Sequence, residues 1–126
     1  MEKFRELLKE YNEKKKMLFA EFSRTFTTTV AEMFIEGVDT ISFPMYTMYF
    51  NDGEECTFYV YFDNVEINGE SMYDKDFQQE EDDMISKIGK IVEEIPEKFF
   101  KDVFGDHILL TIYRDGEFST SHYSHD

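Results

Sequence analysis

Hydrophobic and polar positions alternate most regularly between residues 41 and 64, and this alternation predicts a β-hairpin over residues 40–64. Two apolar runs flank the sequence Asn51-Asp52-Gly53, which suits a tight turn because such a turn needs a residue at positive φ. Pro44 lies in the first run. Since proline has no N–H to donate to a neighbouring strand, Pro44 indicates that this strand lies at an edge of the sheet.

The second run of the predicted hairpin has two distinct faces, because successive side chains of a strand point to opposite sides. Its apolar face is formed by Cys56, Phe58, Val60 and Phe62, and its other face by Thr57, Tyr59, Tyr61 and Asp63. A tyrosine face can serve as a recognition surface, since the phenol combines apolar area with a hydrogen-bonding tip. It can also be covered by a helix, and this second interpretation is favoured. Cys56 is then a small buried hydrophobic residue.

The first part of the chain has helical spacing, with apolar residues that recur at steps of three, four or seven. This pattern predicts one long helix over residues 1–36, or two helices in line, ending at Gly37. The β-branched run Thr27–Thr29 favours a break or kink, because these side chains are restricted in χ1. The stripe consists of Phe4, Leu8, Tyr11, Leu18, Phe22, Phe26, Val30 and Met33.

The middle of the chain is polar and then helical. Residues 65–76 predict an acidic surface loop with a turn at Asn68-Gly69. Residues 77–104 predict a helical segment that Pro96 interrupts, with Asp74 or Asp76 as its N-terminal cap. The apolar stripe of this segment is Phe77, Met84, Ile88, Ile91 and Ile95.

The chain ends in a second predicted hairpin, over residues 107–123, that turns at Asp115-Gly116. Ile108, Leu110 and Ile112 form the buried face of its first strand, opposite Phe118. The order helix, hairpin, helix, hairpin predicts an α+β fold. We expect a single domain over residues 1–126, in which helices cover one face of a four-stranded, mostly antiparallel sheet.

Composition supports a folded domain of modest size. The 126 residues are 41% hydrophobic and 17% aromatic, which provides for one core. No run of about 18 apolar residues and no signal peptide is evident, so a cytoplasmic protein without membrane contact is expected. The single cysteine excludes an intramolecular disulfide.

The net charge of −15 is unevenly distributed. Residues 1–36 contain seven acids and seven bases, so the other 90 residues carry the whole excess. Between residues 52 and 83, 12 acids are opposed only by Lys75. This field repels phosphate backbones and attracts basic partners, which argues against direct nucleic-acid binding. Solubility alone is the competing explanation.

The sequence offers little catalytic chemistry. No glycine-rich loop opens a helix. A nucleophilic triad needs a serine or cysteine near a histidine; the only histidines are His107, His122 and His125, and Cys56 lies in a predicted core strand, so a Cys/His enzyme is not favoured. The C-terminal residues His122, His125 and Asp126, with Asp115, are of types that bind first-row metals. However, His122 and His125 would face opposite sides of a strand. We therefore expect no catalytic residue, no cofactor and no metal.

The C-terminal sequence LLTIYRDGEFSTSHYSHD and the order of predicted elements resemble the YezG-type immunity proteins, which are cytoplasmic antitoxins of bacterial polymorphic-toxin systems. The similarity in residues covers about the last 18 positions. The matching residues are Leu110, Thr111, Ile112, Asp115, Gly116, Phe118, Tyr123 and Asp126.

The resemblance implies a protein that binds a cognate basic toxin domain, with a nuclease as the leading case, and blocks it by occlusion. Three alternatives remain open: a phage-type DNA mimic that inhibits a host DNA-binding or restriction enzyme, a metal-dependent enzyme that uses the C-terminal histidines, and a structural or adaptor domain. The charge and the tyrosines select the residues expected to contact the partner. They are Asp52, Glu54, Glu55, Tyr59, Tyr61, Asp63, Glu66, Glu70, Tyr73, Asp74, Asp76, Glu80, Glu81, Asp82 and Asp83.

Overall fold

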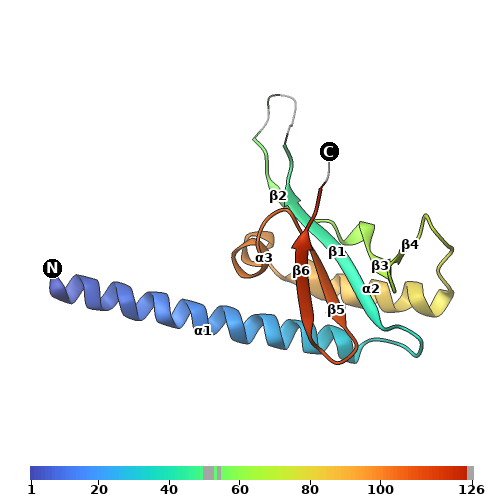
Figure 1. Cartoon of the computed structure of the whole chain (residues 1–126), viewed down its shortest axis with the longest axis horizontal. Coiled ribbons are helices and arrows are strands. Elements are labelled where there is room, and N and C mark those ends of the chain that lie inside the picture. The colour runs from blue at the N-terminus through green and yellow to red at the C-terminus, as the bar shows by residue number, and fades with distance from the viewer. Residues whose placement is uncertain (50–52, 54, 125–126) are drawn as a thin grey trace.

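The computed structural model describes residues 1–49, 53 and 55–124. It shows an α+β fold with a long N-terminal helix, an antiparallel sheet and two further helices (Figure 1). The elements are α1 (Glu2–Glu32), β1 (Thr40–Thr47), β2 (Phe58–Val60), the 3-10 turn η1 (Phe62–Asn64), β3 (Glu66–Ile67), β4 (Glu70–Ser71), α2 (Gln79–Glu94), α3 (Glu97–Phe104), β5 (Ile108–Tyr113) and β6 (Phe118–His122).

Within the described residues the sheet has six strands, in the order β4-β3-β1-β5-β6 with β2 also paired to β1. On one side, β1 pairs with β5 from Thr40 to Met45. On its other side, β1 pairs first with β3 and then with β2. The predicted α+β class is confirmed, but four strands was an underestimate. The segment predicted as an acidic loop contributes β3 and β4, which form a small hairpin around the turn at Asn68-Gly69.

Pro44 was predicted to mark an edge strand, and this prediction is wrong, because β1 is central. The carbonyl oxygen of Pro44 accepts a hydrogen bond from the backbone N–H of Tyr61 at 2.9 Å. In a strand, the N–H and C=O of one residue point to the same side, so the missing N–H also faces the segment near Tyr61. There η1 interrupts the pairing between β2 and β3. Proline therefore fits because the Tyr61 carbonyl, which would face an N–H at position 44, accepts the backbone N–H of Asn64 at 3.1 Å instead.

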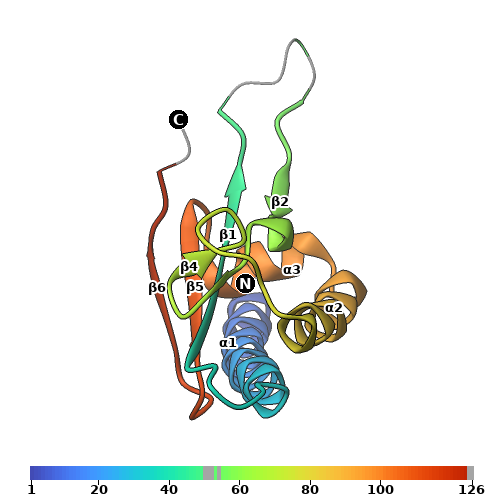
Figure 2. The same ribbon diagram turned by 90° about the vertical axis from the view of Figure 1, so that its right-hand side faces the viewer.

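The hydrophobic core lies between one face of the sheet and the helices (Figure 2). The sheet contributes Ile41, Phe43 and Met45 of β1, all fully buried, together with Leu110 and Ile112 of β5. The helices contribute Phe26 and Val30 of α1, Met84, Ile88 and Val92 of α2, and Phe100 and Phe104 of α3. The predicted stripe of residues 77–104 and the second half of the first predicted stripe, from Phe22 to Met33, thus meet the predicted buried face of β5. The first half of that stripe, Phe4, Leu8, Tyr11 and Leu18, is exposed.

The first helix is continuous over 31 residues, which confirms the prediction of one long helix and shows no break in the threonine run. It ends at Glu32 instead of Glu36. Thr27 is fully buried, and its Oγ lies 2.9 Å from the carbonyl oxygens of both Ser23 and Gly116. Tertiary packing and this hydroxyl contact outweigh the low helix propensity of threonine.

Two local predictions near the helical segment and the first hairpin were also wrong. The N-cap of α2 is Gln78, whose backbone N–H donates to the Glu81 carboxylate at 2.8 Å. Asp74 instead accepts the backbone N–H of Ser71 at 3.0 Å. β2 begins only at Phe58, so Cys56 lies outside the strand and is exposed. Pro96 separates α2 from α3 as predicted.

We expect the substitution Thr27→Val to lower the free energy of unfolding by about 1–2 kcal/mol, because the Gly116 carbonyl would lose its donor from α1 while the side-chain shape is kept. Thr25→Val is the matched control, since Thr25 is exposed in the same helix. Urea denaturation of both variants measures the difference. Equal stability of the two variants would show that the contact between α1 and the β5–β6 turn contributes nothing.

Candidate protein-binding surface

The outer face of the sheet carries a cluster of four tyrosines, which we call the tyrosine face: Tyr46, Tyr59, Tyr61 and Tyr123. Tyr46 points to this outer face because its neighbour in β1, Met45, points into the core. The Tyr46 ring stacks on Tyr61 with centroids 4.2 Å apart and on Tyr123 with centroids 5.7 Å apart. Tyr59, which pairs with Tyr46 across the two strands, meets Tyr61 edge-on at 6.1 Å.

The prediction that a helix covers this face is wrong. The three helices pack on the opposite face of the sheet, and no helix of the described chain lies over the tyrosines (Figure 2). Tyr59 retains 41% of its exposure, while Tyr46, Tyr61 and Tyr123 are half-buried. The apolar residues at alternate positions of β1 and β2 pack into the core. The tyrosines between them therefore point to the solvent side.

Two phenols of the tyrosine face have raised pKa values. Burial, followed by the neighbouring phenols of Tyr46 and Tyr59 and the carboxylate of Glu97, raises the pKa of Tyr61 to about 12. Burial, followed by Tyr46 and Glu66, also raises the pKa of Tyr123. Both hydroxyls therefore remain protonated over the physiological range.

A hollow of about 260 Å³ adjoins the tyrosine face, between η1, the β3–β4 hairpin and Tyr123. Carboxylates and aromatic rings converge there, an arrangement that suits a lysine or arginine side chain. Tyr73 is 86% exposed at its rim. The lining residues are Asp63, Asn64, Val65, Glu66, Ser71, Met72, Tyr73 and Tyr123.

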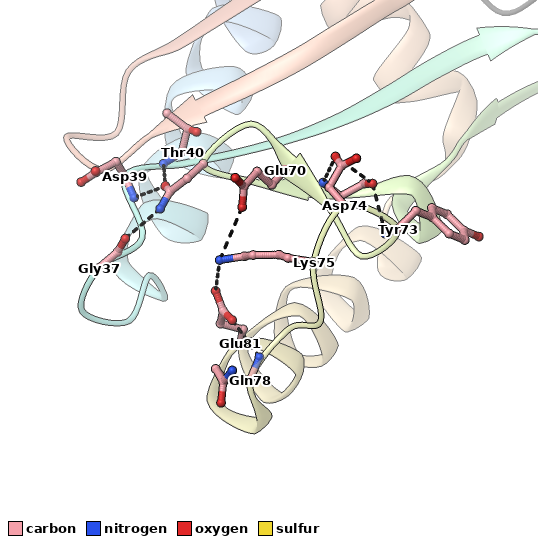
Figure 3. Close-up of polar contacts among 11 residues, drawn as sticks. Gly37, Asp39, Thr40, Glu70, Tyr73, Asp74, Lys75, Gln78 and Glu81 are labelled. Carbon is pink, nitrogen blue, oxygen red and sulfur yellow. Dashed lines mark hydrogen bonds and ion pairs between the residues drawn. The ribbon is translucent and has the colours of Figure 1, made fainter.

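Beyond this hollow, the β3–β4 hairpin and the start of α2 form what we call the acidic corner (Figure 3). Lys75 lies within it, with its Nζ 3.8 Å from Glu70 Oε2 and 3.9 Å from Glu81 Oε2. A single cation cannot neutralise the surrounding acids, so the corner stays negative. Its carboxylates belong to Glu70, Asp74, Asp76, Glu80, Glu81 and Asp82.

A second hollow, of about 510 Å³, separates the acidic corner from the turn that follows α1. Ile35 and Val38 provide apolar surface in it, and Glu36, Glu80 and Glu81 provide charge. Its wall is held by Asn68, whose side-chain oxygen accepts the backbone N–H groups of Asp39 at 2.7 Å and Thr40 at 3.1 Å. The Asn68 amide donates to the Gly37 carbonyl at 2.9 Å, so both ends of the turn are fixed (Figure 3).

The structure brings most of the predicted contact residues onto these connected surfaces. Tyr59 and Tyr61 belong to the tyrosine face, Asp63, Glu66 and Tyr73 line the smaller hollow, and the six acids just named form the acidic corner. Glu55 is exposed before β2 and lines neither hollow. Asp83 accepts a hydrogen bond from Gln79 at 2.9 Å along α2. Asp52 and Glu54 lie outside the described residues.

Sequence reasoning missed Tyr46, Tyr123 and Glu97. The signal for Tyr46 was present, since it alternates with the apolar residues Phe43 and Met45 of the same run. Glu97 gave no signal, because its role depends on tertiary structure. Its carboxylate accepts the backbone N–H of Val60 at 2.7 Å and so supports β2, the strand that carries Tyr59.

Metal chemistry and membrane insertion receive no support from the described chain. Within residues 1–49, 53 and 55–124, no three histidine, cysteine or acidic side chains are grouped as a metal site requires. His122 is exposed on β6, and the other histidine of the predicted tail site, His125, lies outside the described residues together with Asp126. None of the described helices is long and apolar enough to cross a bilayer.

No protein-family model, curated protein or solved structure matches this chain. The resemblance of the C-terminal hairpin to YezG-type immunity proteins therefore remains a prediction. The conclusions about function depend on the tyrosine face, the two hollows and the acidic corner.

Spectrophotometric titration tests the environment of the tyrosine face. We expect one tyrosine to ionise near pH 12 and this component to disappear in Tyr61→Phe. Since the pKa of tyrosine in an unfolded chain is about 10, the Tyr61 contribution to stability is complete below pH 10 and is lost as the pH rises through 12. Tyr113→Phe, which removes an exposed tyrosine of β5, is the control. If every tyrosine of the wild type ionised near the ordinary pKa of about 10, the result would contradict the stacked arrangement.

Proposed function

We propose that this chain is an inhibitory binding protein of the immunity type, which covers the active-site cleft of a basic toxin and acts without catalysis. The observation that carries the proposal is the uncovered tyrosine face, which continues through a carboxylate-lined hollow into the acidic corner. A nuclease is the leading candidate for the partner, because enzymes that bind phosphate backbones have basic clefts.

The charge distribution supports fast binding to such a partner. The acidic corner and the smaller hollow hold many more carboxylates than cations, and Lys75 is engaged between Glu70 and Glu81. Complementary charge raises the association rate and selects against acidic partners. An inhibitor that must act before damage occurs benefits from this steering.

The tyrosines support tight binding once the partner has arrived. Tyrosine is enriched among the residues that dominate binding energies, since it offers a large contact area at a low cost in conformational entropy. Stacking already restricts Tyr46, Tyr61 and Tyr123 in the free protein. The exposed rings of Tyr59 and Tyr73 are available to meet arginine or lysine side chains of a basic cleft.

Coexpression with the product of the adjacent gene tests this function. If that product is toxic, we expect the wild-type chain to restore growth and to bind it in purified form with an affinity that falls as salt rises. Tyr73→Ala should weaken binding at least about tenfold, and Glu66→Lys should slow association and reduce its salt dependence.

Asp102→Lys is the matched control, because it makes the same charge reversal as Glu66→Lys at an exposed position on α3, on the helical side of the sheet. It should bind like the wild type. Equal losses for Asp102→Lys and Glu66→Lys would assign the effect to net charge alone. Binding to several unrelated DNA-binding proteins, each displaced by duplex DNA, would favour the DNA mimic instead.

A further inference from the structure

The N-terminal half of α1 projects away from the domain and carries exposed apolar side chains (Figure 1). Every residue from 1 to 18 is exposed. The contact of α1 with the rest of the chain begins at Phe19, whose ring meets Phe99 of α3 edge-on at 5.5 Å. We call residues 2–18 the free half of α1. A group of large apolar side chains exposed along one helix indicates an interaction surface.

These apolar residues form a continuous stripe. Phe4, Leu8, Tyr11 and Leu18 are 49–65% exposed, and with Lys15 they follow one another at steps of four, three, four and three residues. This spacing is the heptad seam of a coiled coil. The next step of four leads to Phe22, which packs on Phe99 with ring centroids 4.6 Å apart. The free stripe is therefore the direct continuation of the interface between α1 and α3.

We propose that the free half of α1 pairs with the same segment of a second copy of this chain, in antiparallel orientation about Tyr11. The inference depends only on the exposed stripe and holds whether or not the proposed inhibitory function does. A twofold-symmetric interface must be self-complementary, and three residues of the stripe meet this condition directly. Tyr11 meets its own copy, and Phe4 and Leu18, which both lie seven residues from Tyr11, face each other across the pair.

The polar positions fit the same arrangement. Leu7 and Leu8 of one copy lie opposite the aliphatic stems of Lys15 and Lys14 of the other, whose ammonium groups can extend to solvent. Lys14 already pairs with Glu10 of its own helix at 2.9 Å. A single lysine within an apolar seam is a known means of fixing register and limiting the number of helices.

Charge explains why the pair is antiparallel. The free half contains six bases and four acids, a net charge of +2, so the other residues carry −17. In a parallel pair, two such domains would lie side by side. In an antiparallel pair about Tyr11, the two Phe19 positions are about 24 Å apart along the axis at 1.5 Å per residue. This is about three Debye lengths at physiological salt, so the repulsion is screened.

Sedimentation of the full chain over a range of concentrations tests the proposal. The stripe is about 21 Å long, so its area falls at the low end of protein interfaces and we expect a reversible monomer–dimer equilibrium. Tyr11→Glu should raise the dimer dissociation constant at least about tenfold, because two carboxylates would meet at the twofold axis. Circular dichroism should show that the variant remains folded, since residue 11 makes no core contact.

Met17→Glu is the matched control. Met17 is 72% exposed in the same half of the helix but lies off the seam, so the same change of an apolar residue to glutamate should leave the dimer intact. A monomer at all concentrations, or equal effects of the two variants, would overturn the proposal.

Disulfide trapping distinguishes the orientation. In a Cys56→Ser background, which removes the native thiol, Tyr11→Cys should cross-link two copies on oxidation and Phe4→Cys should not. Cross-linking through both positions would indicate parallel helices, and cross-linking through neither would contradict pairing about Tyr11.

Discussion

The two-sided character of β1 is the constraint on which the rest of this structure depends. Ile41, Phe43 and Met45 point to the helices and are fully buried, while Ser42, Pro44 and Tyr46 point to the outer face. Because β1 is paired along both edges, its register also fixes β2, β3 and β5. A slip of one residue would exchange the core and the tyrosine face. Fold and candidate binding surface are thus set by the same alternation.

The tyrosine face differs from an ordinary solvent-exposed side of a sheet. Ser42 and Thr111 share a hydrogen bond of 2.9 Å further along the same side of the sheet, and Tyr46 stacks on both Tyr61 and Tyr123. The rings shield each other, yet Tyr59 remains exposed, and Tyr73 is exposed beside the carboxylates of Asp63 and Glu66. This combination of ordered aromatic area and adjacent charge is what a protein needs to bind a basic surface, and it requires no cofactor.

Sequence alone predicted much of the fold because its strongest signals are local. The Asp115-Gly116 turn, the stripe of residues 77–104 and the break at Pro96 were confirmed, and the first helical stripe packs into the core from Phe22 onward. The errors arose where tertiary contacts decide the outcome. Pro44 is tolerated in a central strand because η1 interrupts the ladder there, and the threonine run stays helical because Thr27 contacts Gly116. Similarly, Tyr123 joins the tyrosine face because β5 pairs with β1 and so brings the C-terminal hairpin beside Tyr46, and no local pattern reveals that pairing.

The most direct test of the binding surface is amide hydrogen exchange of the chain with and without its partner. The account predicts that binding slows exchange in residues 58–73 and 118–123, which carry three of the four tyrosines of the tyrosine face together with the smaller hollow, and leaves the exposed side of α3 unchanged. Protection confined to α2 and α3, with no change in β2 or in the β3–β4 hairpin, would contradict it and would place the partner on the helical side of the sheet.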